Sequence, residues 1–199
     1  MKVRYIAIIL AVISFTACNS NSNKEGSEHH DTADTTAHSH DAGIPETAQQ
    51  KTAPSFKSDE TIADYLQLKN ALAADNSNDA AEAGKKLNAN LFAIDNKSLS
   101  EEQQKTMNDV LGDAQEHAEH IGANAGNIKH QREHFEMLSK DIADIIKTFG
   151  NGGRTLYKDF CPMASEGKGA IWISEVKEIK NPYLGNKMPT CGSVKEELK

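Results

Sequence analysis

The sequence predicts a mainly α-helical fold: an antiparallel four-helix bundle with a small loop-rich C-terminal appendage that contains short β segments. Between residues 58 and 150, four stretches carry apolar residues at the spacing of one helix face. Short polar or glycine-containing segments separate them, and helices joined by short loops pack as antiparallel neighbours. The helical spacing ends at the Gly-Asn-Gly-Gly run at 150–153. We therefore expect the bundle over residues 58–150 and the appendage over 151–199, packed on one end of the bundle.

The first two helices are predicted from their apolar stripes and their start signals. Ser58 is expected to cap the first helix, because Asp59 and Glu60 follow it and suit the positive end of a helix. The second helix is expected over about 79–94, after the polar interruption at 76–78. The inward-facing positions are Ile62, Tyr65, Leu66, Leu68 and Leu72 in the first helix, and Ala80, Ala83, Leu87, Leu91 and Ile94 in the second.

The third helix has the clearest start signal in the chain. Ser100 and Gln103 stand at the spacing of a capping box, in which each side chain accepts a hydrogen bond from the other residue's backbone. The fourth helix is expected over about 127–149. The inward-facing positions are Met107, Val110, Leu111, Ala114, Ala118 and Ile121 in the third helix, and Ile128, Phe135, Leu138, Ile142, Ile145 and Phe149 in the fourth. In the appendage, extended segments are expected at 155–160 and 170–173.

Residues 1–17 have the features of a secretory signal peptide. Lys2 and Arg4 precede an apolar run that is too short to span a bilayer comfortably. The run ends with small residues directly before Cys18, which resembles the lipobox of bacterial lipoproteins, although Phe15 replaces the usual aliphatic residue. We expect a membrane-anchored lipoprotein that faces the periplasm of a Gram-negative-type envelope. The alternative is an ordinary signal peptide that is cut nearby.

Residues 18–57 are expected to form a lipidated, flexible tether, because they contain almost no large apolar side chain that could form a core. Histidines alternate with acidic residues in this segment, and such pairs chelate Zn(II) or Cu(II) weakly. The segment is therefore predicted to capture metal as an auxiliary site, unless its histidines are merely polar residues of a solvated linker. These histidines are His29, His30, His38 and His40.

Four sulfur-containing side chains form two mirrored motifs in the appendage. Cys161 and Met163 flank one proline, and Met188 and Cys191 lie on either side of another. Thiolates and thioethers are soft ligands that favour Cu(I). If Cys18 is lipidated, the two remaining cysteines are an even count in an oxidising compartment, so a structural disulfide is a serious alternative to a metal site.

Two histidine pairs lie where the third helix ends and the fourth begins. His117 and His120 are three residues apart, and His130 and His134 are four apart. Residues that face each other in an antiparallel helical hairpin have a nearly constant sum of residue numbers, and these pairs satisfy that condition. Imidazoles from facing helices bind metals in bundle proteins. The alternative is that they are solvated helical histidines.

Several functions are not expected. The net charge of −7 argues against binding to nucleic acid. An enzyme is not expected either, because the chain lacks a nucleophile elbow, a glycine-rich phosphate loop and an H-E-x-x-H motif.

The chain resembles an uncharacterised (DUF-type) helical domain that occurs in exported lipoproteins and in CusB-like membrane fusion proteins of copper/silver efflux. The residues that carry the resemblance are Gln131-Arg-Glu-His-Phe135, Cys161-Pro-Met-Ala164, Trp172-Ile-Ser174, Ile179-Lys-Asn-Pro-Tyr-Leu-Gly185 and Met188-Pro-Thr-Cys-Gly192. The resemblance covers roughly residues 58–195 and implies a periplasmic Cu(I)/Ag(I)-associated binding domain. The ligands that it implies are His120, His134, Cys161, Met163, Met188 and Cys191.

Together these features predict an exported, membrane-tethered heavy-metal binding protein. Its cofactor is expected to be Cu(I), with Ag(I) or Zn(II) as further candidates. It is expected to buffer the metal or to deliver it to an efflux system through a copper/silver membrane fusion protein. The alternative is an interaction module that binds no metal and is stabilised by a Cys161–Cys191 disulfide.

Overall fold

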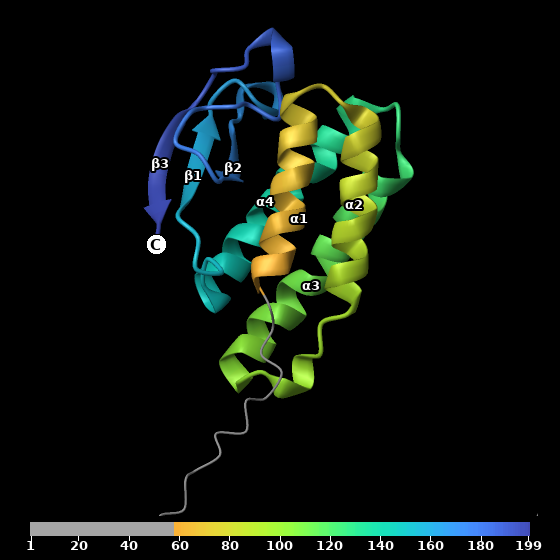
Figure 1. The fold of residues 1–199 in the computed structure, drawn as a ribbon, viewed down its shortest axis with the longest axis vertical. Coiled ribbons are helices and arrows are strands. Elements are labelled where there is room, and N and C mark those ends of the chain that lie inside the picture. The colour runs from red at the N-terminus through yellow and green to blue at the C-terminus, as the bar shows by residue number, and fades with distance from the viewer. Residues whose placement is uncertain (1–57) are drawn as a thin grey trace, which may run out of the picture. The chain divides into compact units, whose positions relative to one another are not determined.

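The computed structural model describes residues 58–199. The predictions on residues 1–57, namely the signal peptide, the lipidated Cys18, the tether and its four histidines, lie outside these residues. The helices are α1 (Ser58–Ala73), α2 (Ser77–Phe92), α3 (Glu101–Ala123) and α4 (Ile128–Phe149), and the strands are β1 (Leu156–Cys161), β2 (Ala170–Ser174) and β3 (Ser193–Leu198) (Figure 1). Short 3-10 helices are η1 (Asn96–Ser98), η2 (Ser165–Gly167) and η3 (Gly185–Lys187). Within the described range, no helix is both long enough and apolar enough to cross a bilayer.

The four predicted helices are confirmed, and side-chain caps explain where three of them begin. Asn76 accepts a hydrogen bond from the backbone of Asp79, so α2 starts at Ser77 rather than at the predicted position near Asp79. The capping box is present at the start of α3, where Ser100 and Gln103 bond to each other's backbone. The side chain of Asn127 caps α4 in the same way as Asn76 caps α2.

The apolar stripes of the helices meet in one core. Each helix contacts the next one along the chain, and α1 also contacts α4. Most predicted inward positions are buried, whereas those at the helix ends are only partly so, for example Ile94, Ile128 and Phe149. α2 and α3 approach closely at Gly84, where an added Cβ atom would lie 2.9 Å from Cγ2 of Ile121 and 3.0 Å from the backbone nitrogen of Gly122.

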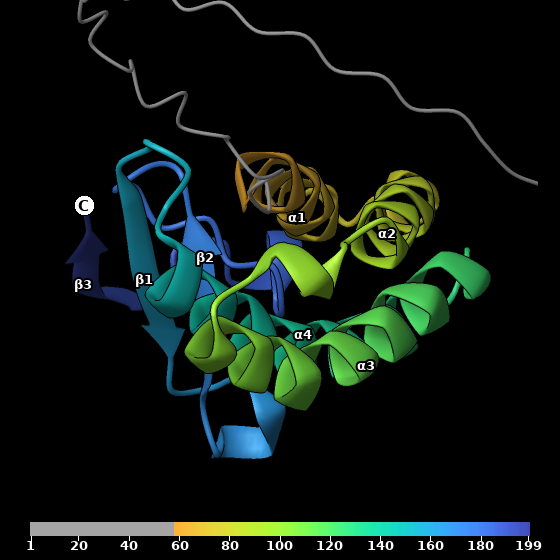
Figure 2. The ribbon, with the colours of Figure 1, turned by 90° about the horizontal axis from the view of Figure 1, so that it is seen from below.

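The strands form one antiparallel sheet in the order β2-β1-β3. The two predicted extended segments correspond to β1 and β2, but β3 was not predicted from the sequence. Most of the residues of β3 are exposed, so it lacks the apolar alternation that marks a half-buried strand. β2 packs against α4 and α1, and the sheet therefore lies along the flank of these helices, whereas an end of the helices was expected (Figures 1 and 2).

Two tyrosines bond to the outer edge of β2. The backbone N–H of Ile173 donates to the hydroxyl of Tyr65 on α1 at 3.1 Å, and the hydroxyl of Tyr183 donates to the carbonyl of Ile171. The Tyr65 hydroxyl also bonds to Ser139 of α4 at 2.8 Å. Backbone groups of an edge strand that have no strand partner thus find side-chain partners in the core, and the sheet is fixed to both helices.

Candidate metal centres

The structure brings Cys161 and Cys191 together. Cys161 is the last residue of β1, and Cys191 lies two residues before β3, which pairs with β1 beginning at Phe160 and Ser193. The two sulfur atoms are 2.8 Å apart, and both residues are free cysteines. Strand pairing therefore converts a separation of thirty residues in sequence into a direct contact between the thiols.

The turn that carries Cys191 is held by an almost fully buried side chain, Asn181. Its amide donates to the carbonyl of Cys191 at 2.6 Å, and its backbone N–H donates to the carbonyl of Pro189 at 2.9 Å. Gly192 follows with a φ of 144°, and a Cβ atom there would lie 2.8 Å from Cη2 of Trp172. Only glycine fits this close approach, and the sequence motif gave no reason for it beforehand.

The two methionines of the motifs differ from the cysteines in burial. Cys161 is inaccessible to solvent, whereas Met163 and Met188 are 57% and 43% exposed. Both methionine backbones contact Cys191, since its N–H donates to the carbonyl of Met188 and its sulfur lies in reach of the Met163 backbone. The two methionines are thus exposed residues whose backbones adjoin the partly buried Cys191.

The thiol of Cys191 is protonated near neutral pH. Its hydrogen bond with Cys161 and, second, its burial raise its pKa, while the backbone hydrogen bond from Met163 acts in the opposite direction. A soft metal that binds this thiolate must therefore displace a proton.

The structure also confirms that the four helical histidines meet across the α3–α4 hairpin. The Nδ1 atoms of His117 and His134 are 3.2 Å apart, and the ring centroids of His120 and His130 are 5.9 Å apart. The rings of His120 and His134 stack at 4.3 Å and are nearly parallel. Ligand atoms of His120, His130 and His134 all lie within 4.8 Å of one another, so one ion could contact all three.

Two of these imidazoles are held in the neutral form. Burial lowers the pKa of His134 to about 4, assisted by the neighbouring rings of His120, His130 and His117. Burial also lowers the pKa of His117. Neutral imidazole has the lone pair that a metal requires, and so neither ring must lose a proton near pH 7.

The cysteine pair and the histidine cluster are on different elements. Among residues 58–199, three or more His, Cys, Asp or Glu side chains come close enough to share one ion at the histidine cluster. That group includes neither Cys161 nor Cys191. Phe135, which follows His134, packs instead against Tyr65 and Tyr183 in the core. The six ligands that the resemblance implied therefore belong to two groups.

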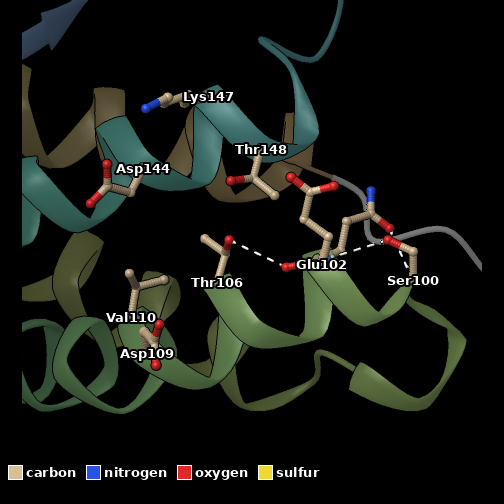
Figure 3. A pocket seen from close by; sticks show the side chains of 9 residues that line it. Ser100, Glu102, Thr106, Asp109, Val110, Asp144, Lys147 and Thr148 are labelled. Carbon is tan, nitrogen blue, oxygen red and sulfur yellow. Dashed lines mark hydrogen bonds between the residues drawn. The ribbon is translucent and has the colours of Figure 1, made fainter.

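A polar groove lies near the other end of α3 and α4 (Figure 3). Its volume is about 800 Å³, and neither cysteine nor histidine lines it. The lining side chains include Glu102, Asp109, Asp144 and Lys147. Carboxylates and hydroxyls are hard ligands, so this groove adds no matching ligand to the cysteine pair or to the histidine cluster.

One family model matches the chain. Residues 61–153 match a family described as a protein of unknown function (DUF3347). The match covers almost all of the helical part, including the histidine cluster, and ends before β1 and the cysteines. No curated protein and no solved structure matches the chain significantly.

Proposed function

We propose that the chain is an exported, membrane-tethered metal-binding protein whose Cys161 and Cys191 thiolates hold Cu(I), with Ag(I) as a second ion of the same chemistry. The observation that carries this proposal is the direct contact between two free thiols from distant parts of the sequence. Thiolates are soft ligands and select Cu(I) over harder ions. The antiparallel four-helix bundle belongs to the same proposal, and the contacts of α1 with α4 and of each helix with the next support it.

The surroundings of the thiols suit an ion that is taken up and passed on. Cys191 is partly exposed while Cys161 is buried, so an ion enters from the side of Cys191. Met163 and Met188 are exposed beside it and offer thioether ligands at the entrance. A buffer, or a carrier that delivers the ion to a copper/silver efflux membrane fusion protein, needs such an accessible side. We propose no enzymatic reaction.

The export and anchoring parts of the proposal depend on the sequence of residues 1–57. The signal peptide and lipidated Cys18 would place the protein on a membrane facing the periplasm. The histidines of the tether would supply an auxiliary site for capturing ions.

The second candidate is an interaction module that binds no metal and is locked by a Cys161–Cys191 disulfide. The same sulfur contact favours it, because an external disulfide oxidant could remove two electrons and two protons from the adjacent thiols. In the chain-entropy model, closing this loop would stabilise the fold by about 3–4 kcal/mol.

Two measurements distinguish these candidates. Thiols are first counted in protein isolated from the exported compartment without a reductant. Two free thiols, in addition to any contributed by unlipidated Cys18, support the metal site, and their absence supports the disulfide.

The reduced protein is then titrated anaerobically with Cu(I) against a Cu(I) chelator. Cys191→Ser is expected to abolish tight binding, while Met137→Leu serves as the control because Met137 is an exposed methionine of α4 outside both motifs. Unchanged affinity in a folded Cys191→Ser variant would overturn the proposal. Met163→Leu and Met188→Leu report whether thioethers join the site.

A further inference from the structure

We infer that His120, His130 and His134 form a second, independent metal site that takes a borderline divalent ion, Zn(II) or Cu(II), and that His117 positions one of the ligands. This inference goes beyond the thiol site, because it assigns a different ion to a different part of the fold. It requires no contribution from either cysteine.

The geometry of the hairpin requires little movement to bind an ion. His130 and His134 are one turn apart on α4 and face His120 on α3. Their ligand atoms lie within 4.8 Å of one another. Three nitrogens bound tetrahedrally to zinc at about 2.0–2.1 Å are about 3.3 Å apart. Side-chain rotation can close this difference without any change in the helices.

One ring must turn for all three to reach the same ion. The rings of His120 and His134 are stacked and inclined by only 5°, so their in-plane lone pairs do not converge as they stand. The side chain of His120 is 46% exposed, whereas that of His130 is 33% exposed. We therefore assign the rotation to His120, the ring with the most freedom.

One nitrogen of each ring lies near a polar side chain, and we assign the other nitrogen to the ion. Nδ1 of His134 contacts Nδ1 of His117 at 3.2 Å, which leaves Nε2 of His134 as the ligand atom. Nδ1 of His130 lies 3.4 Å from a carboxylate oxygen of Glu133, and Nε2 of His120 lies 3.9 Å from one of Glu116. Polar partners of this kind orient metal-binding imidazoles and raise their basicity.

The role of His117 follows from its contact with His134. If Nδ1 of His134 donates its hydrogen to Nδ1 of His117, then Nε2 of His134 keeps its lone pair for the metal. His117 is thus a positioning residue and touches no ion itself. Glu133 has the same relation to His130, and its role could have been suspected from the spacing of three residues along α4.

The donor set selects the ion. Three imidazoles without a thiolate suit Zn(II), Cu(II) or Ni(II), whereas the soft thiolate pair of the appendage favours Cu(I). Three protein ligands leave at least one coordination position to water, so the bound ion can exchange. The protein would then hold two ions of different softness at once.

The test uses the full chain with the two other candidate metal sites removed. Cys161→Ser and Cys191→Ser eliminate the thiol site, and the four tether histidines His29, His30, His38 and His40 are replaced by asparagine. This protein is titrated with Zn(II) against a chromophoric chelator. We expect one Zn(II) per chain to bind at micromolar concentrations, and, with Cu(II), an electron paramagnetic resonance spectrum with nitrogen ligands.

Variants in this background assign the roles. His134→Ala and His120→Ala are expected to abolish stoichiometric binding, while His117→Ala is expected to weaken it by about 10–100-fold and retain one ion per chain. Glu119→Ala is the control, because Glu119 is an exposed residue on the same turn of α3. Circular dichroism verifies that each variant is folded.

The outcomes are decisive. Failure of the background protein to bind Zn(II) below millimolar concentration would overturn the inference, as would undiminished binding by folded His134→Ala and His120→Ala variants. If His117→Ala binds as tightly as its parent, the positioning role is wrong. Loss of Cu(I) binding in the Cys191→Ser variant is a separate result, so either site can fail without the other.

Discussion

Replacing either of two helical glycines by alanine is expected to change stability in opposite directions. Gly84 and Gly112 both lie in helix interiors, where alanine is favoured over glycine by about 1 kcal/mol. A Cβ atom at Gly112 would meet no atom within 4 Å, so Gly112→Ala is expected to raise the free energy of unfolding by about 0.5–1 kcal/mol. The intrinsic preference acts alone at this position.

At Gly84 the same methyl group would collide with α3. It would lie 2.9 Å from Cγ2 of Ile121, 3.0 Å from the backbone nitrogen of Gly122 and 3.1 Å from the carbonyl oxygen of Ala118. Two of these atoms belong to the backbone and the third to a stiff β-branched side chain, so the helices must separate. Overpacking costs about 1–3 kcal/mol, with larger values where backbone must move. We expect Gly84→Ala to lower the free energy of unfolding by about 1–2 kcal/mol.

The assay is urea unfolding followed by circular dichroism for the helices and by fluorescence of Trp172 for the sheet side. Coincident transitions by the two probes license a two-state treatment. The free energies of unfolding of the two variants are expected to differ by about 1.5–3 kcal/mol, although both make the same chemical change. If Gly84→Ala were as stable as the parent, then α2 and α3 would not pack as closely as the structure indicates.

Three further predictions concern buried polar groups. Tyr65→Phe leaves the N–H of Ile173 without its acceptor and is expected to cost about 2 kcal/mol in urea unfolding, with faster amide exchange at Ile173; unchanged exchange there would contradict the assignment. Burial, followed by repulsion from neighbouring carboxylates, raises the pKa of Asp141 to about 7, so the stability that its protonated form contributes is full below pH 4 and lost as the pH rises through 7. Asp141→Asn should therefore be more stable than the parent at pH 8, by about 1 kcal/mol after allowance for solvent screening. At pH 4 the two proteins should be equally stable. Glu175→Gln removes the carboxylate that lies 2.7 Å from the amino group of the fully buried Lys69 and is expected to lower the free energy of unfolding by about 3 kcal/mol. Lys69→Met should lower it less, because Glu175 can turn to water. An equal loss of thermal stability in the two variants would refute this account.

The helical part could be predicted from the sequence because its signals are local. The capping box at Ser100 and the apolar stripes depend on spacings of three and four residues, and both appear in the structure. The meeting of His117 with His134 was predictable for a related reason. An antiparallel hairpin with a short loop fixes which residues face each other, so a sum of residue numbers is enough.

The surroundings of the cysteines could not be predicted in the same way. The contact between Cys161 and Cys191 depends on β3, whose residues are mostly exposed and whose pairing with β1 arises from backbone hydrogen bonds. Hydrophobic periodicity does not predict such a strand, because the strand has no buried face. The resemblance implied one set of six ligands, and no local signal in the sequence could reveal that two helices and a separate sheet would divide them. Asn181 appeared in the sequence only within a run that carries the resemblance, although its side chain holds the cysteine turn in place.

The tyrosine contacts at the edge of β2 also bear on how the protein tolerates crowding. A sheet edge with unpaired backbone groups can recruit a strand from another molecule and begin aggregation. Tyr65 and Tyr183 occupy one edge from within the core, so a foreign strand would first have to displace α1. At the other edge, β3 carries the charged residues Lys195, Glu196 and Glu197 in succession, and charged side chains on an edge strand disfavour pairing with a foreign strand. Both edges of the sheet therefore disfavour the addition of a strand from another molecule.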